Sequence, residues 1–145
     1  MKEKLINRVT IKTLASQENK NAIVQAAVTY IRQFEIFWLS ESKMNEIQIS
    51  LEEAVDNVIN FAYKKKFGTV SICLSFCDNM ILEIEVRDWG CGIKDIEQAR
   101  SPMFTTDGEN DRSGMGFTIM ESYSDGLIVK STPGKGTIVT MKYKT

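Results

Sequence analysis

Glu53, Asn57 and Asn60 are spaced four and three residues apart in a segment with helical periodicity. That spacing places the three side chains on one face of a helix. A carboxylate that takes a proton from a hydroxyl or a water, beside an amide oxygen that binds Mg²⁺, is a combination that supports phosphoryl transfer from ATP. The competing interpretation is an ordinary solvated helix face.

A second candidate is the run Asp88-Trp89-Gly90-Cys91-Gly92, which stands where an expected strand leaves its sheet. Alternating glycines let the backbone turn and let a flat ligand approach without a Cβ in the way. An ionised Asp88 only accepts hydrogen bonds, which suits the exocyclic amine of adenine and disfavours the carbonyl of guanine. A simple turn at the exit of a hairpin would have the same composition.

A third candidate, Arg112-Ser113-Gly114-Met115-Gly116, leads directly into an expected helix. Free N–H groups at a helix start form an anion site, and Arg112 adds charge-assisted bonds to a terminal phosphate. The polar stretch 104–111 before it, which includes Thr105 and Thr106, suits a lid over a bound ligand. A flexible glycine-rich loop is the alternative.

The last candidate is Gly134-Lys135-Gly136-Thr137, whose threonine hydroxyl enters a strand that could lie beneath an adenine pocket. Most such sequences are only hairpin turns. The segment is not a P-loop, because the upstream glycine and the strand-to-helix context are missing.

The composition limits the chemistry available to this chain of 145 residues, which has a formal net charge of −1 and no histidine. Histidine bases, histidine zinc ligands and a phosphohistidine relay are therefore excluded, and no global charge attracts nucleic acid or an anionic membrane. Cys73, Cys77 and Cys91 lack metal-binding spacing and are expected to be reduced thiols. No segment has the length or apolar character of a membrane span, so we expect a cytoplasmic protein.

The elements that must position these candidates follow from the apolar periodicity. Strands are expected near 5–14, 70–77, 82–86, 127–131 and 137–143, and helices near 22–34, 42–62, 95–99 and 117–123. Hairpins with helices inserted between them predict a single α+β domain over 1–145. We expect a two-layer sandwich, in which about three helices cover one face of a mixed, mostly antiparallel sheet. The apolar run 36–39 is either an interface or core, and core is favoured.

Taken in chain order, the candidates resemble the N box and glycine boxes of the ATP-binding fold shared by DNA gyrase, histidine kinases and MutL. The carrying residues are Glu53, Asn57, Asp88, Gly90, Gly92, Gly114, Gly116, Gly136 and Thr137. The runs 101–106 and 112–121 closely resemble the anti-sigma F factor family and related serine kinases of bacterial partner-switching systems. The similarity spans essentially the whole chain.

This resemblance implies roles for the matching residues. Glu53 would be the general base, Asn57 the Mg²⁺ ligand and Asp88 the adenine reader. Gly90, Gly92 and Thr137 would form the adenine pocket. The lid and phosphate cradle would comprise Thr105, Thr106, Arg112, Ser113, Gly114, Met115 and Gly116, with Arg112 also neutralising charge during transfer.

The resemblance also implies ATP or ADP with Mg²⁺ as cofactors, a homodimer, and an RNA polymerase sigma factor as partner. It further implies an ATP-dependent serine kinase that phosphorylates an anti-anti-sigma protein in the control of sporulation transcription. An alternative is a catalytically idle, nucleotide-sensing module that sequesters a protein. A histidine-kinase half is disfavoured, because the chain has no acceptor histidine.

Overall fold

A computed structural model describes residues 4–34, 37, 39–64, 66–101 and 115–145. Its strands are β1 (Leu5–Leu14), β2 (Thr69–Cys77), β3 (Ile81–Asp88), β4 (Gly126–Thr132) and β5 (Gly136–Lys144). Its helices are α1 (Gln17–Gln33), α2 (Glu41–Asn57), a π-helical turn η1 (Val58–Ala62), α3 (Ile96–Arg100) and α4 (Gly116–Tyr123). Every expected element is present in the described residues.

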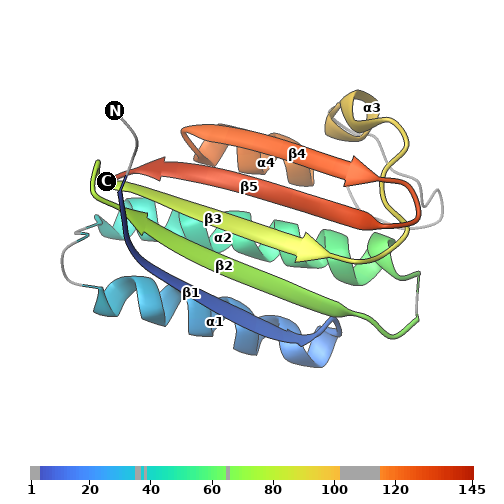
Figure 1. The fold of residues 1–145 in the computed structure, drawn as a ribbon, viewed down its shortest axis with the longest axis horizontal. Coiled ribbons are helices and arrows are strands. Elements are labelled where there is room, and N and C mark those ends of the chain that lie inside the picture. The colour runs from blue at the N-terminus through green and yellow to red at the C-terminus, as the bar shows by residue number, and fades with distance from the viewer. Residues whose placement is uncertain (1–3, 35–36, 38, 65, 102–114) are drawn as a thin grey trace.

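The strands form one sheet in the order β1-β2-β3-β5-β4 (Figure 1). All four pairings are antiparallel, so the expected α+β class is confirmed with a fully antiparallel sheet in the described part of the chain. β3 and β4 run in the same direction but are separated by β5, because the connection through α3 and α4 crosses one strand. This crossover places the start of α4 close to α2.

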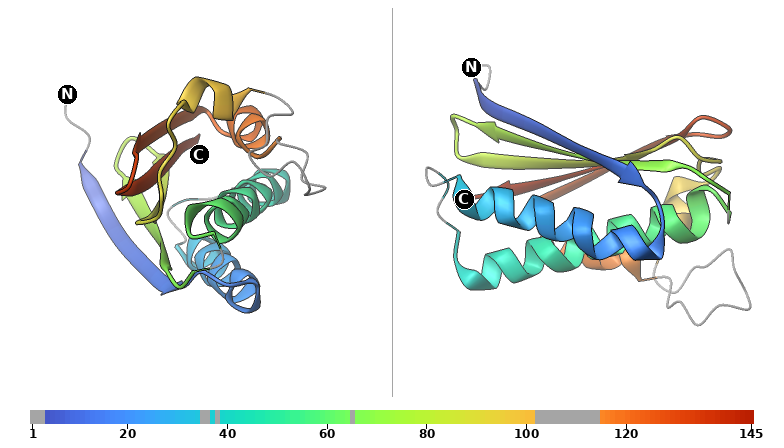
Figure 2. Two further views of the ribbon diagram at one scale, coloured as in Figure 1. Left: turned by 90° about the vertical axis from the view of Figure 1, so that its right-hand side faces the viewer. Right: turned by 90° about the horizontal axis from the view of Figure 1, so that it is seen from below.

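The long helices cover one face of the sheet and leave the other face open (Figure 2). Alternation along the strands explains this, because Ile72, Leu74, Ile84 and Met141 are completely buried while their neighbours in sequence face outward. α2 lies in the middle of the helical layer and packs against α1 on one side and α4 on the other. The central helix therefore has two covered flanks.

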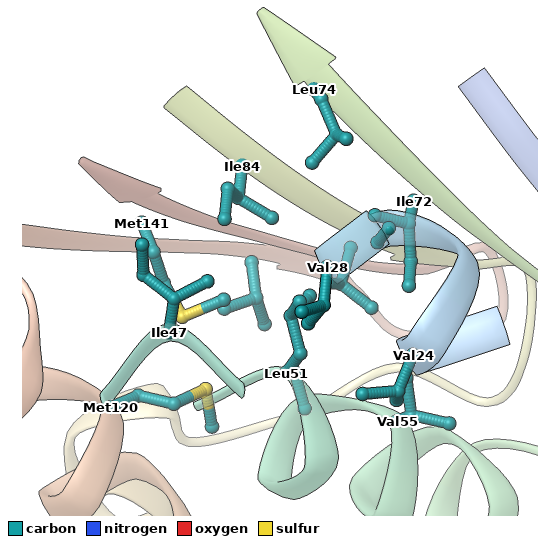
Figure 3. Close-up of a cluster of buried hydrophobic side chains, with 14 of the residues drawn as sticks. Val24, Val28, Ile47, Leu51, Val55, Ile72, Leu74, Ile84, Met120 and Met141 are labelled. Atoms are coloured by element: carbon teal, nitrogen blue, oxygen red, sulfur yellow. The ribbon is translucent and has the colours of Figure 1, made fainter. Parts of the chain in front are cut away.

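The core between the two layers is continuous (Figure 3). α1 contributes Val24 and Val28, which lie against Leu51 and Val55 of α2 and against the sheet. Ala22 and Ala26, which are also apolar residues of α1, are exposed. The larger β-branched side chains and Ala27 thus face the core, whereas Ala22 and Ala26 face water.

The apolar run 36–39 is confirmed as core for the two of its residues that the structure describes. Phe37 is 3% exposed and contacts Phe34 and Phe76, with ring centroids 5.8 and 5.3 Å away. Leu39 is half-buried against the same cluster. Ile36 and Trp38 lie outside the described residues.

The second helix differs from the expected single helix over 42–62, because its last turn is π-helical. The wider turn shifts the side chains after Asn57 from the α-helical positions that the spacing predicted. Asn60 turns its amide back to the Asp56 carbonyl, with 2.7 Å between Nδ2 and O. The Asn60 amide therefore bonds its own helix. Asn60 is not equivalent to Glu53 and Asn57 on that helix face.

Candidate nucleotide-binding site

Glu53 and Asn57 meet the first residue of α4. A Cβ placed on Gly116 would lie 3.3 Å from Glu53 Oε2 and 3.3 and 3.4 Å from Asn57 Nδ2 and Oδ1. Both side chains are only half-buried, in the flank of α2 that α4 covers. The pair therefore lies beside a helix–helix contact and not on a fully exposed helix face. We call Glu53, Asn57 and Gly116 the phosphate end of the candidate site.

The start of α4 has the properties of an anion site. Its N-cap residue, Met115, provides no capping side chain, and the first N–H groups of a helix have no intrahelical acceptor. These donors carry the positive end of the helix dipole. The glycine at position 116 keeps a side chain away from the two polar groups of α2.

The donor set at the phosphate end fits Mg²⁺. Asn57 offers an amide oxygen and Glu53 a carboxylate oxygen close to Gly116. Within the described residues, no group of three or more acidic or cysteine side chains forms a metal cage. Mg²⁺ suits this arrangement, because it commonly retains water and takes most of its remaining ligands from substrate phosphates.

At the other end of the site, Asp88 is the last ladder residue of β3 and is 6% exposed. One carboxylate oxygen accepts from the Gly90 N–H at 2.9 Å. Burial raises the pKa of Asp88 above its ordinary value, and the backbone N–H groups of Gly90 and Thr137 partly offset that rise. The carboxyl group is thus fixed in direction at the mouth of the sheet.

Thr137 lies directly opposite Asp88 in the pairing of β3 with β5 and is buried. Its hydroxyl is 2.7 Å from Ser131 Oγ of β4. Ser131 also accepts from the Ile93 N–H at 2.7 Å and donates to the Gly136 carbonyl at 3.0 Å. The structure therefore unites Asp88 and Thr137, as expected, and adds Ser131 as the residue that connects them to the loop after β3. We call this group the adenine end.

The two loop glycines at the adenine end are in contact with the chain's own backbone. A Cβ on Gly90 would lie 2.2 Å from the Ala62 carbonyl oxygen of the π-helical turn. Gly92 has φ of +76°, and its Cβ would lie 2.4 Å from the Thr132 carbonyl oxygen. Glycine is required at both positions because the loop is packed between the π-helical turn η1 and the β4–β5 hairpin.

Some of the expected site residues lie in the part of the chain that the structure describes, and others lie outside it. Glu53, Asn57, Met115 and Gly116 lie at the phosphate end, and Asp88, Gly90, Gly92 and Thr137 at the adenine end. The expected lid and phosphate-cradle residues Thr105, Thr106, Arg112, Ser113 and Gly114 lie outside the described residues. Ser131 was not predicted, since an isolated serine in a strand gives no sequence signal until the register places it beside Thr137.

The three cysteines have free thiols. Cys91 is exposed in the loop after Asp88, and its Sγ is 3.4 Å from the Phe61 carbonyl oxygen. Among the described helices, none combines the length and apolar character required to cross a membrane.

Comparisons with known proteins agree with this fold. The family described as "Histidine kinase-like ATPase domain" matches residues 15–143. An anti-sigma F factor from Caldanaerobacter subterraneus subsp. tengcongensis is 39% identical over 135 residues, which cover 93% of this chain and 92% of the relative. An anti-sigma F factor from Clostridium acetobutylicum is 36% identical over 140 residues, covering 97% and 95% of the two chains.

Solved structures share the fold at low sequence identity. The mycobacterial sensor histidine kinase MprB superimposes with a TM-score of 0.58 at 15% identity, covering 93% of this chain and 97% of that one. The histidine kinase domain of the Erythrobacter litoralis EL346 blue-light activated kinase gives 0.56 at 18% identity, covering 86% and 60%.

Proposed function

This chain belongs to the histidine kinase-like ATPase domain family and, within it, to the anti-sigma F factors, and on that premise we propose that it is an ATP-dependent protein serine kinase. In this proposal it binds an RNA polymerase sigma factor and phosphorylates a serine of an anti-anti-sigma protein, acting as a homodimer in the cytoplasm. The observation that carries the catalytic part is the convergence of Glu53 and Asn57 on Gly116 at the start of α4.

Each end of the site has a distinct task. Asp88 accepts from the adenine amine, and Thr137 and Ser131 hold the strands beneath the base. The first N–H groups of α4 bind phosphate oxygens. Asn57 supplies an oxygen to Mg²⁺, which, when bound, offsets the negative charge of the triphosphate.

In this proposal Glu53 takes the proton of the attacking serine hydroxyl. The serine oxygen forms a bond to the γ-phosphorus, the bond between that phosphorus and the β–γ bridging oxygen breaks, and ADP leaves with the electron pair. Most of the rate gain in such a reaction comes from positioning and charge stabilisation. The expected contribution of Arg112 to that charge stabilisation remains part of the proposal.

The test combines calorimetry with intact-protein mass spectrometry. The chain is titrated with ATP and ADP in the presence of Mg²⁺, and is then incubated with ATP and an anti-anti-sigma protein from the same genome. We expect binding heat and a mass increase of one phosphate on a serine of the partner. Binding without phosphate transfer would instead favour the idle sequestering module, and the absence of binding heat with both nucleotides would refute the proposed site.

A further inference from the structure

Three consecutive backbone N–H groups follow the end of β3, and each is held by a different partner. The Trp89 N–H donates to the Tyr63 hydroxyl at 2.8 Å. The Gly90 N–H donates to the Asp88 carboxylate at 2.9 Å, and the Cys91 N–H donates to the Ala62 carbonyl at 2.8 Å. Among these acceptors, Tyr63 contributes a side chain that is not itself part of the candidate site.

The Tyr63 hydroxyl lies between two strands. It accepts from Trp89 and donates to the Thr69 carbonyl oxygen at 2.6 Å. The β2–β3 ladder ends with the pair Val70 and Asp88, so the hydroxyl bridges the strands one position beyond the last direct pairing. Its single proton and an acceptor site are both used by the protein backbone.

The ring of Tyr63 is fixed as well as its hydroxyl. It lies against Gly68, where a Cβ would come within 2.2 Å of the ring carbons. Tyr63 also follows the π-helical turn directly and caps its C-terminal end. One side chain therefore connects the end of the helix that carries Asn57 to the backbone next to Asp88.

On the outer face, the Trp89 ring is held by two cations. Lys12 Nζ is 4.3 Å and Arg87 Cζ is 4.9 Å from its centroid. The backbone of the same residue is bound from the helical side by Tyr63. Residue 89 is thus restrained from both sides. The two cations hold its ring, and the Tyr63 hydroxyl holds its backbone beside Asp88.

We propose that Tyr63 is a positioning residue that sets selectivity for adenine by fixing the backbone at Trp89 and, through it, the direction of the Asp88 carboxylate. This role rests on the proposed function of the site. Hydrogen bonds weaken steeply with misalignment, so a carboxylate distinguishes an amine from a carbonyl only when its direction is fixed. Tyr63 itself contacts no reacting atom.

The substitution Tyr63→Phe tests this role, because it removes the hydroxyl and retains the ring against Gly68. Tyr30→Phe is the matched control, since it removes a hydroxyl that accepts from Asn7 Nδ2 at 2.6 Å on the opposite flank of the fold, between α1 and β1. Each protein is titrated with ATP and with ITP, which carries a carbonyl in place of the adenine amine. Amide hydrogen exchange is followed at Trp89 and Cys91 without nucleotide.

We expect Tyr63→Phe to accelerate exchange at Trp89, because the Trp89 N–H loses its acceptor, and to weaken ATP binding by about three- to tenfold. ITP binding should change less, so the ATP-to-ITP affinity ratio falls. Tyr30→Phe should leave that ratio at the wild-type value.

Two results would overturn the role of Tyr63. One is an unchanged ATP-to-ITP ratio in Tyr63→Phe, whatever the change in thermal stability. The other is unchanged exchange at Trp89. Failure of the proposed function is recognised separately, because the wild-type chain would then bind neither nucleotide, and that result overturns both.

Discussion

At the adenine end, the loop after β3 is held by the chain's own hydrogen bonds, including those of the N–H groups of Trp89, Gly90, Cys91 and Ile93. At the phosphate end, two polar side chains of α2 instead meet a glycine of α4 across a helix–helix contact. One region is built from backbone bonds within a sheet and its loops, and the other from side chains on separate helices. The adenine end is thus held within the fold by backbone hydrogen bonds, whereas the phosphate end is a contact between half-buried side chains of α2 and the start of α4.

The largest expected effect tests this separation at the phosphate end. Glu53→Gln should reduce serine phosphorylation by about 10²- to 10⁴-fold, because the general base is lost. ATP affinity and the melting temperature should stay close to the wild-type values. Phosphate transfer by mass spectrometry, calorimetry and thermal melting measure the three quantities.

Glu52→Gln is the control for that substitution, because Glu52 is the neighbouring carboxylate and bonds Gln48 at 3.1 Å within the same helix. It should retain phosphate transfer. Comparable losses in both variants would argue against a specific role for Glu53.

The adenine end should respond to Asp88→Asn with a loss of nucleotide affinity. We expect ATP binding to weaken by about 10- to 100-fold, as for the loss of a hydrogen bond to a charged group. Asp78→Asn, at the far end of the β2–β3 hairpin, is the control. Equal ATP affinity in Asp88→Asn and wild type would remove the assignment of Asp88 as the adenine reader.

The same aspartate predicts a pH effect on the free protein. Because burial raises the pKa of Asp88 in the folded state, its contribution to stability is fully present below the unfolded pKa and is lost as pH rises through the folded pKa. At neutral pH the ionised carboxylate therefore destabilises the free chain. Asp88→Asn should be more stable than wild type at neutral pH, with the difference shrinking in acid, as urea unfolding across pH would measure.

At the phosphate end, Gly116→Ala is expected to lower phosphate transfer without lowering the stability of the fold. Alanine favours the helix, so the free energy of unfolding should rise by about 0.5–1 kcal/mol or stay unchanged. The new Cβ would push on Glu53 and Asn57, so phosphate transfer should fall by about tenfold. Gly126→Ala is the control, since its Cβ would meet only Lys142 Cβ, at 3.9 Å.

At the adenine end, Ser131→Ala is expected to change nucleotide affinity less than Asp88→Asn. It leaves the Ile93 N–H without its acceptor, so unfolding should cost about 1–3 kcal/mol less. ATP affinity should fall only a few-fold, because Ser131 acts through Thr137 and the loop. Ser122→Ala on the exposed side of α4 should change neither property.

Apolar periodicity alone predicted the strands and helices, because the period of two in β2 and β3 and the helical period of α1 and α2 are local properties of the chain. It also placed Glu53 and Asn57 on one helix face. It did not predict the π-helical turn at Val58–Ala62, whose last residue contacts Gly90 and Cys91 of the distant loop. It likewise missed the importance of Tyr63 and Ser131, because their hydrogen-bond partners lie in other segments of the chain.

The sequence by itself thus determined the elements, the polar groups available and the glycines that permit close approach. Only the tertiary structure decided that Gly116 lies against Glu53 and Asn57, that Thr137 pairs with Asp88, and that the Tyr63 hydroxyl bridges two strands. The physical reason is that local backbone preferences act over a few residues. Hydrogen bonds and excluded volume between segments that are distant in the chain exist only after the sheet order and the β3–β4 crossover have brought them together.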